Sequence, residues 1–242
     1  MQSDSQRERL TTGDELHYSP RAFLRLQSWL SPSFPYGAYT YSHGLEWAVE
    51  ARHIHDRSSL VDWLEADLCY GSGRNEAIFF SEAYRCVIKS DQAGLTRVAE
   101  LASAFRGTSE FALESSQQAT ACLATLRQIW PHPVLDLLLE MSCQPVLAVV
   151  LGTRSASERI PVRVALPAFL HSYVANLVIA GVRLIPLGQT DGQLAISVLE
   201  DAVLSTSAQG NCATLDDLGS AGFMVEFASI AHETQYTRLF RS

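Results

Sequence analysis

The sequence predicts an all-α protein, a single helical domain of about ten helices around a central apolar helix. Three observations lead to this prediction. Apolar residues recur at steps of three and four through most of the chain, which is the period of an amphipathic helix. No convincing series of alternating strand residues occurs. The most apolar stretch, residues 164–182, contains no charged residue and is long enough for a buried helix.

Length and charge limit the classes of protein that fit. A chain of 242 residues allows one large domain or two small ones. It is also long enough to bury roughly 70–75% of its unfolded surface, so it needs no disulfide or metal to hold a core. The formal net charge of −8 argues against a nucleic-acid-binding protein, because contacts to phosphates require a basic surface.

Cysteine spacing and the N-terminus indicate a cytoplasmic protein. The five cysteines are widely spread, with no CxxC pair and no zinc-ligand spacing, which is typical of a reducing compartment. Residues 1–19 are polar, mixed in charge and without the apolar core of a signal peptide. We expect them to form a flexible N-terminal tail.

The first predicted helix begins at Arg21, where Phe23, Leu26 and Leu30 share one apolar face. The following segment, residues 31–46, reads SPSFPYGAYTYSHGLE and should end that helix. Its two prolines fix φ and lack an N–H group, and its first glycine permits a turn.

This aromatic loop should lead into a second helix. Thr40 or Ser42 is predicted to cap that helix, and Glu46 would lie in its first turn, where negative charge suits the helix dipole. Ordered loops of this kind often carry function. For Tyr39 and His43, a functional role and a packing role are equally open.

Capping residues and breakers predict the helices that follow. The first of them begins at Ser58 or Ser59 and ends at Gly71 and Gly73. Two more are expected at 77–88 and 95–105, and Asp91 should cap the second of these. A long helix from Thr108 or Ser109 to Trp130 follows, and then two short helices at 134–141 and 146–151.

The apolar stretch at residues 164–182 admits two interpretations. Its nineteen residues approach the roughly 20 that span a bilayer. However, Pro167, His171 and Asn176 interrupt it, and polar groups are costly in hydrocarbon. We therefore predict the central helix of a helical domain, with His171 as a buried, hydrogen-bonded core residue and no membrane contact.

Beyond this stretch, Pro186 and Gly188 should break the helix, and Thr190 or Asp191 should cap a next one that continues through Val203. The glycines here match neither GxxxxGK[ST] nor GxGxxG, so a tight junction between helices is favoured over a phosphate site. Residues 205–222 are small and polar, which predicts a loop.

The last segment, residues 227–242, is unusually apolar for a chain end. Tyr236, Leu239 and Phe240 are spaced so that a helix would place them on one face. Such a segment can dock on its own core or fold into a groove of a partner protein, and the pattern slightly favours self-docking. No GxSxG or HExxH motif occurs, so no histidine is assigned a catalytic role.

Three segments together carry a resemblance to a known family. They are residues 31–46, residues 186–193 with the sequence PLGQTDGQ, and residues 232–242 with the sequence HETQYTRLFRS. In this order and spacing the chain resembles the urease accessory protein UreF family. The fit is weaker between about residues 107 and 160, where Ala112 and Ala119 replace a basic residue and a glycine.

The resemblance implies an all-α homodimer without enzymatic activity and without a cofactor. Such a protein joins the accessory protein UreD, also called UreH, and the GTPase UreG. The assembly helps load nickel into apo-urease, and the UreF component modulates GTP-dependent insertion. Activation, exchange and proofreading of the GTPase are not separated by the sequence.

The resemblance also assigns partner-binding residues, but no catalytic and no metal-binding ones. The loop would contribute Tyr39, Ser42, His43, Gly44 and Glu46, the tail would contribute His232, Glu233, Tyr236, Arg238 and Leu239, and the surface between them would include Gln189, Asp191 and Gln193. The expected organisation is a tail at 1–19, a helical domain at 20–226 and a partner-binding segment at 227–242. Arg238 is expected to reach a carboxylate or a backbone carbonyl with its forked guanidinium.

Two alternatives belong to other classes. His43, His53, His55 and His232 could gather nickel directly, because imidazole suits that ion, which would make the protein a metallochaperone. A hydrolase whose catalytic groups meet only in the fold would need an acid or a nucleophile beside His43 in a deep cleft.

Overall fold

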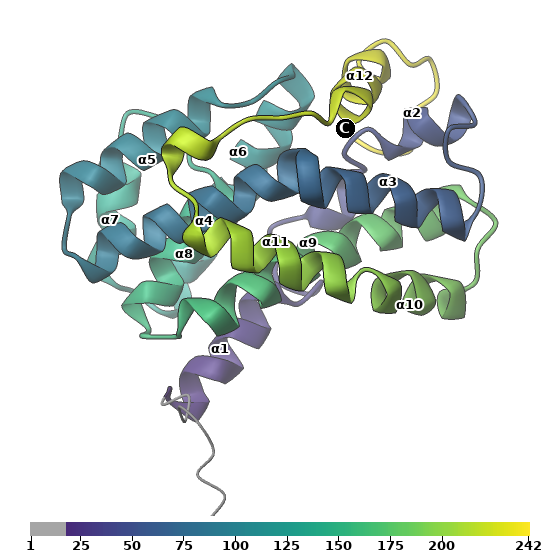
Figure 1. The fold of residues 1–242 in the computed structure, drawn as a ribbon. Helices are drawn as coiled ribbons and strands as arrows, with labels where there is room; N and C mark the ends of the chain where they lie inside the picture. Colours follow the sequence, from purple (N-terminus) through teal and green to yellow (C-terminus); the bar gives the residue numbers. More distant parts are fainter. Residues whose placement is uncertain (1–17) are drawn as a thin grey trace, which may run out of the picture.

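The computed structural model describes residues 18–242, which form helices and no strand (Figure 1). The predicted N-terminal tail therefore lies almost wholly outside the described residues. In this range the α-helices are α1 (Pro20–Leu30), α2 (Leu45–Glu50), α3 (Arg57–Tyr70), α4 (Ser72–Ile88), α5 (Gln92–Ala104), α6 (Ser109–Ile129), α7 (Pro133–Glu140), α8 (Leu147–Ser157), α9 (Val162–Leu184), α10 (Gln189–Val198), α11 (Glu200–Cys212) and α12 (Phe223–His232), with short 3-10 helices at Ala38–Thr40 and Leu215–Asp217. The predicted all-α class is confirmed.

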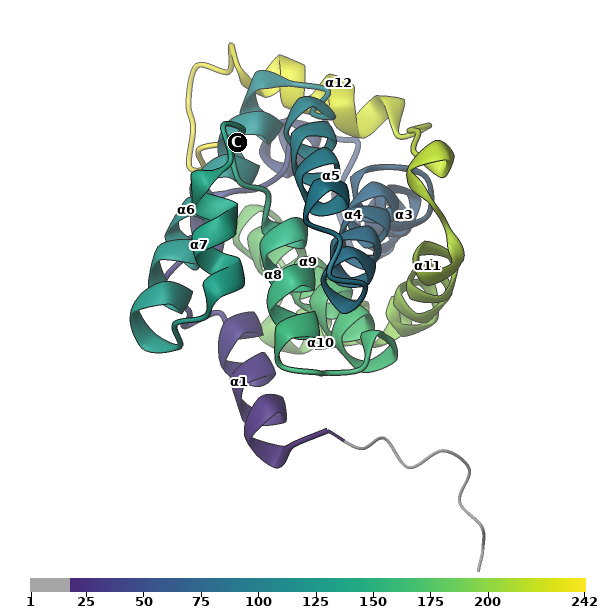
Figure 2. The same cartoon turned by 90° about the vertical axis from the view of Figure 1, so that its left-hand side faces the viewer.

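Helix α9 is the central helix that the sequence predicts. It packs against α1, α2, α3, α4, α8, α10 and α11. By length and composition α9 is a candidate membrane span among residues 18–242, yet 50% of its most apolar window is buried inside the protein. Its contacts on several sides therefore identify it as a core helix. Figure 2 shows α1 projecting from the helical body that surrounds α9.

One prediction about α9 is wrong. His171 is exposed instead of buried in the core. It lines a groove of about 530 Å³ between α1, α9 and α10, because the few contacts between α1 and α9 leave that side of the helix partly uncovered. Ser172, the next residue, is buried, and its hydroxyl donates to the carbonyl oxygen of Leu30 at 2.9 Å.

The most extensive helix contact in the described chain joins α4 and α8. Gly152 makes this contact possible, because a Cβ atom at that position would overlap the backbone carbonyl of Phe80. The ring of Phe80 in turn stacks on Phe169 of α9, with 5.2 Å between ring centroids. Apolar burial and close packing thus hold the centre of the molecule.

Two predicted boundary signals around α3 are wrong, namely its N-cap and one of the two glycines expected to stop it. Asp56 caps the helix instead of Ser58 or Ser59, since its carboxylate accepts from the backbone N–H of Ser59 at 2.8 Å. Gly71 ends α3 as predicted, but Gly73 lies inside α4, which begins five residues before the predicted start at residue 77. The missing side chain at Gly73 lets α4 turn sharply against Leu68 of α3.

The region after α9 also differs from the prediction. Gly188 holds the N-cap position of α10, and Asp191 contributes from the third helical position by accepting from the Gly188 N–H at 3.3 Å. The predicted single helix through Val203 is divided at Leu199, a buried residue that faces the core between α10 and α11. Helix α11 then runs to Cys212, so half of the predicted loop at 205–222 is helical.

Several other boundaries agree with the sequence. Asp91 caps α5 by accepting from the N–H of Gly94 at 2.8 Å, and Thr108 caps α6 by accepting from the N–H of Phe111 at 3.1 Å. All five cysteines are free thiols.

Candidate functional site

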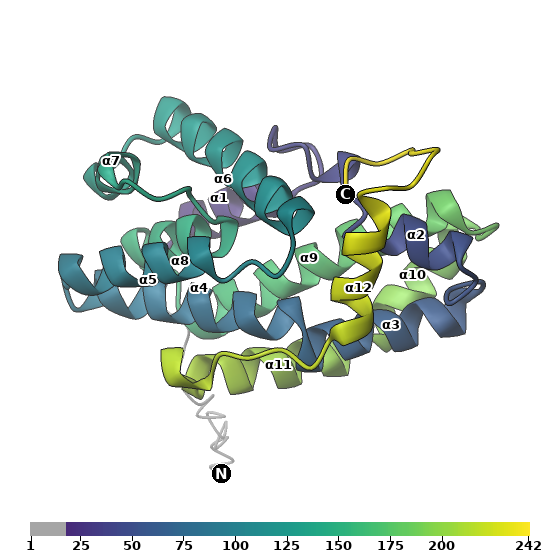
Figure 3. The ribbon, with the colours of Figure 1, turned by 90° about the horizontal axis from the view of Figure 1, so that it is seen from above.

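The aromatic loop and the C-terminal segment lie side by side, although about 190 residues of chain separate them. Figure 3 shows α2, α12 and the C-terminus gathered at one edge of the molecule. The backbone N–H of Arg241 donates to the carbonyl oxygen of Thr40 at 2.9 Å, and the N–H of Ser42 donates to the main-chain oxygen of Ser242 at 2.7 Å. We call residues 37–46, the first part of α6 (108–118) and residues 232–242 the junction.

Left-handed backbone conformations shape the loop side of the junction. Gly37 and Gly44 have φ of 76° and 79°, and His43 between them has φ of 56° although it is not a glycine. A Cβ atom on Gly44 would also lie 3.0 Å from the backbone nitrogen of Ser229, so α12 can approach only a glycine there. Gly44, and not Thr40 or Ser42, is the N-cap of α2, although the Ser42 hydroxyl accepts from the Glu46 N–H at 3.3 Å.

Glu46 joins the tail to the loop through hydrogen bonds. Its side chain is buried, with a relative exposure of 7% for the residue. One carboxylate oxygen accepts from the backbone N–H of Leu239 at 2.6 Å, and the other accepts from the N–H of Phe240 at 2.8 Å. A buried carboxylate requires such donors, because desolvation without them is expensive.

His232 connects Glu46 to α6. Its exposure is 0%, its Nε2 lies 3.2 Å from Glu46 Oε2, and its Nδ1 lies 2.8 Å from Glu110 Oε2. Each ring nitrogen of His232 therefore faces one carboxylate, and the ring links α2 to α6. Arg238 adds an ion pair of 3.0 Å to Glu110, so the carboxylate that Arg238 reaches belongs to its own chain.

His43 forms a second buried pair, with Glu114. The distance from Nδ1 to Glu114 Oε2 is 3.3 Å, and the ring stacks on Phe111 with 3.9 Å between centroids. Burial lowers the pKa of His43, but the charge and hydrogen bond of Glu114, with smaller contributions from Asp67 and Glu76, outweigh burial and raise that pKa above the ordinary histidine value.

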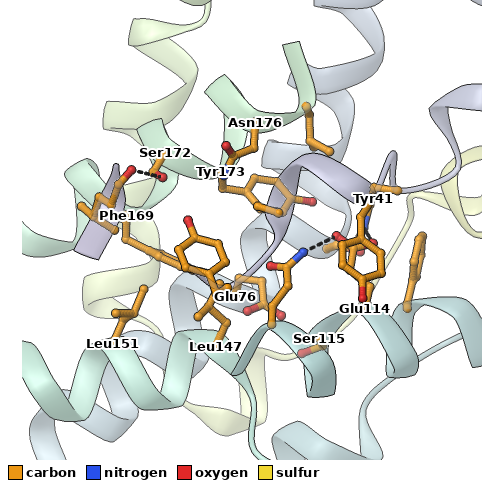
Figure 4. Close-up of a pocket in the computed structure, with 18 of the residues that line it drawn as sticks. Tyr41, Glu76, Glu114, Ser115, Leu147, Leu151, Phe169, Ser172, Tyr173 and Asn176 are labelled. Atoms are coloured by element: carbon orange, nitrogen blue, oxygen red, sulfur yellow. Dashed lines mark hydrogen bonds and ion pairs between the residues drawn. The ribbon is translucent and has the colours of Figure 1, made fainter. Parts of the chain in front are cut away.

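A small cavity of about 60 Å³ lies beneath the junction, between α4, α6 and α9 (Figure 4). Tyr173 reaches it from α9, and its hydroxyl donates to Asp67 Oδ2 at 2.6 Å. Burial, followed by the nearby charge of Asp67, raises the pKa of Tyr173 well above its ordinary value, so its hydroxyl stays a donor. The cavity is large enough to hold water. Glu114 lines it beside His43 and supplies the acid that the hydrolase alternative requires, whereas no hydroxyl or thiol is hydrogen-bonded to that histidine.

The tail is not helical, although the spacing of its apolar residues would suit one face of a helix. Residues 233–242 contain turns and no helix, because Glu46 takes backbone N–H groups that a helix would use. The predicted apolar stripe is divided: Tyr236 is fully exposed, Leu239 is exposed, and Phe240 is 4% exposed beneath the Arg183 guanidinium, which lies 4.4 Å from its ring centroid. This docked tail agrees with the slight preference for self-docking.

The remaining predicted positions fall into two groups. Glu233 belongs to the junction, since its carboxylate accepts from the hydroxyl of Ser109 at 2.5 Å. Gln189, Asp191 and Gln193 lie apart on α10, where Asp191 pairs with Arg57 at 3.1 Å. Within residues 18–242, no hydrogen bond or ion pair joins these three residues to the junction.

Sequence reasoning missed the part of the junction that α6 supplies. Glu110 and Glu114 hold the two histidines, and Gln117 accepts from the Tyr41 hydroxyl at 2.5 Å and from Arg241 at 3.1 Å. The spacing of the two glutamates in the sequence could have indicated them. Glu110 and Glu114 are four residues apart, which places both acids on the helical face that also carries the buried Phe111.

The four histidines of the metallochaperone alternative do not come together. Both nitrogens of His232 face carboxylates, His43 is stacked on Phe111 in the interior, and His53 lies tilted beside Trp47 with 5.6 Å between ring centroids. In the part of the chain that the structure describes, no group of three or more His, Cys, Asp or Glu side chains is arranged to hold a metal ion.

Comparison with known proteins gives one consistent result. The family model described as UreF matches residues 54–200. The protein named urease accessory protein UreF from Rhodopseudomonas palustris strain BisB5 is 47% identical over 223 residues, which cover 91% of this chain and 91% of that protein. Proteins of the same name from Bradyrhizobium diazoefficiens and Magnetococcus marinus are 45% and 46% identical, over 97% and 91% of this chain and 98% of each relative.

Proposed function

The chain belongs to the UreF family of urease accessory proteins, and from that premise we propose that it is a non-catalytic adaptor that bridges UreD (UreH) and the GTPase UreG. In this role it modulates GTP-dependent nickel insertion into apo-urease. The resemblance of the loop and tail motifs supplies these partner names, and the relatives are named as accessory proteins. We expect the protein to act in the cytoplasm as a homodimer.

The single observation that carries the proposal is the assembly of the loop and the tail into one junction. Most polar groups in its interior have partners within the chain, His43 Nε2 and Gln235 Oε1 being exceptions, whereas large side chains at its rim are exposed. Tyr39 is 66% exposed, Tyr236 is fully exposed, and Leu239 is exposed beside them in the tail. Tyrosine and other large side chains on a polar rim are typical of protein interfaces.

Helix α12 extends the apolar character of this region. Phe223, Phe227 and Ile230 lie at steps of four and three on one helix face, and all three are exposed. Phe227 packs against Trp47 of α2 with 5.3 Å between ring centroids, so this face is continuous with the loop side of the junction. We assign α12 and the tail to UreD and the loop around Tyr39 to UreG.

Capture of the partners tests the proposal. We expect tagged UreD to retain the full chain, to retain Arg238→Ala about tenfold less well, and to lose a chain ending at His232, because both changes loosen the tail. Arg127→Ala is the matched control, since Arg127 forms an exposed ion pair with Asp136 on another part of the molecule. Undiminished capture by both tail variants would remove the tail from the interface.

Nickel dialysis and size measurements complete the test. Stoichiometric nickel binding by the isolated chain would favour the metallochaperone over the adaptor. A molecular mass of one chain at all concentrations in light scattering would contradict the homodimer. Co-purification of the chain with both UreD and UreG is the result that we expect for an adaptor.

A further inference from the structure

A second, larger cavity opens beside the junction, between α4, the connection from α5 to α6, and α12. Its volume is about 290 Å³, and we call it the outer pocket. Phe79 and Phe111 at its floor are buried, whereas Ala104 and Phe105 at its rim are exposed. A pocket with aromatic walls, a buried floor and a few polar groups has the general character of a small-ligand site.

Two residues that line this pocket, and also the small cavity beneath the junction, each carry a buried nitrogen atom without a hydrogen-bond partner. These atoms are Nε2 of His43 and Nη2 of Arg106. The rest of each group is satisfied: Nδ1 of His43 faces Glu114, while Arg106 pairs with Glu76 and donates from Nε to the carbonyl oxygen of Ala102 at 3.1 Å. A buried donor without a partner is destabilising, so an acceptor at this place would be stabilising.

The charges around the pocket select the kind of ligand. Glu76 and Glu114 are already paired with Arg106 and His43, and Asp67 already accepts from Tyr173. Of these three acids only Glu76 lines the pocket, and the other acidic residue of its lining, Glu226, is half-buried. The buried groups that lack a partner are therefore the N–H donors of His43 and Arg106, which belong to positively charged or polar side chains. Such donors favour a ligand with carboxylate oxygens over one with an ammonium group.

We propose that the outer pocket binds a small organic carboxylate with a flat apolar body. Its oxygens accept from Nε2 of His43 and Nη2 of Arg106, and its body lies among Phe79, Phe105 and Phe111. The rings of Phe79 and Phe105 form an edge-to-face pair, with 6.0 Å between centroids, which gives a wall suited to a planar group. The volume is near the lower end for ligand pockets, which limits the ligand to about one ring.

The protonation state of His43 should make ligand affinity at this site depend on pH. Glu114 raises the pKa of His43, which extends to higher pH the range in which Nε2 carries a hydrogen. The groups that face this imidazole are Glu114 on α6, Glu76 on α4, Asp67 on α3 and the hydroxyl of Tyr173 on α9. Loss of the proton would remove one of the two donors, so affinity for the carboxylate should fall as pH rises.

Benzoate is the probe for the test, with benzamide and benzylammonium as its neutral and cationic counterparts. We expect saturable binding of benzoate to the full chain in titration calorimetry and saturation-transfer NMR, at least about tenfold weaker binding of benzamide, and none of benzylammonium. Benzoate affinity should fall as pH rises through the raised pKa of His43.

Two variants locate the binding. Arg106→Lys keeps a positive charge for Glu76 but removes the forked second nitrogen, and Ala104→Trp blocks the rim without touching a buried polar group. Each should weaken benzoate binding about tenfold or more, while Arg127→Gln leaves it unchanged. Circular dichroism confirms that each variant is folded. Absence of saturable benzoate binding, equal binding of benzamide, or full binding by folded Arg106→Lys would overturn the proposal.

Discussion

The junction and the helical core beneath it are stabilised by different interactions. In the core, α4 packs on α8 through Gly152 and on α9 through Phe80, and neither contact uses a polar side chain. In the junction, Glu46 and His232 carry the contacts between segments, and both are buried. The core gains from apolar area, whereas the junction gains only where every buried polar group has a partner.

This difference indicates which region can change during function. Removing a core contact leaves a void or an overlap that the rest of the molecule must absorb. The hydrogen bonds of the junction can be exchanged for bonds to another protein or to water, because each one contributes little net free energy. A segment such as residues 233–242 is therefore suited to rearrange on a partner while the core stays fixed.

The largest expected effect is in the core. Gly152→Val should destabilise the fold by about 3 kcal/mol or more, because its side chain would overlap the backbone of Phe80. Chemical denaturation followed by circular dichroism measures this loss. Gly219→Val is the matched control, since no atom lies within 4 Å of the added Cβ atom there. Equal stability of the two variants would show that the contact between α4 and α8 is looser than described.

A smaller effect is expected from the carboxylate of the junction. Glu46→Gln should cost about 1–3 kcal/mol, because the amide cannot serve His232 and the two tail N–H groups equally well. Hydrogen exchange of the amides of Leu239 and Phe240 should become faster. Glu65→Gln, an exposed carboxylate on α3, is the control. Unchanged exchange in Glu46→Gln would mean that the tail is held by other contacts.

The pairing of the buried His43 with Glu114 should make the stability of the junction depend on pH. Because the pKa of folded His43 is raised, protonation stabilises the fold, and this contribution is complete below about pH 6.5, the ordinary histidine value. It is lost as pH rises through the raised pKa. The stability difference between the wild type and His43→Gln, measured by denaturation at several pH values, should therefore shrink at alkaline pH. A difference that grows with pH would contradict the Glu114 pairing.

The smallest effect is expected on α10. Gln189→Ala and Gln193→Ala replace exposed side chains that lie apart from the junction, so each should change stability by no more than about 0.5 kcal/mol. Capture of UreD by either variant should match the wild type in the same pull-down. A loss comparable with that of Arg238→Ala would extend the partner surface to α10 and restore the role that the family resemblance assigns to these residues.

Much of the fold could be predicted from local signals. Apolar periodicity located the helices, and Asp91 and Thr108 were correct caps because a cap acts within three residues of itself. The boundaries that failed depend on distant packing. The sequence predicts a stop at Gly73, whereas this residue lies inside α4 and permits close approach to Leu68.

The candidate site was predicted only in part, for a related reason. The loop and the tail could be selected by their composition and their resemblance to a family, but nothing local indicated that Glu46 would bind the backbone of Leu239. The spacing of the tail would suit a helical stripe, but in the structure the carboxylate of Glu46 accepts from backbone N–H groups of the tail.

By itself, the sequence determined the all-α class, the central helix α9, the absence of familiar enzyme motifs and the family to which the chain belongs. These features depend on short-range periodicity and on motif order, which a linear chain records directly. Only the tertiary structure decided that His232 lies between Glu46 and Glu110, and that Phe240 is buried while Tyr236 is exposed. Burial and hydrogen-bond partners are properties of segments that meet in space, so they depend on residues far away along the chain.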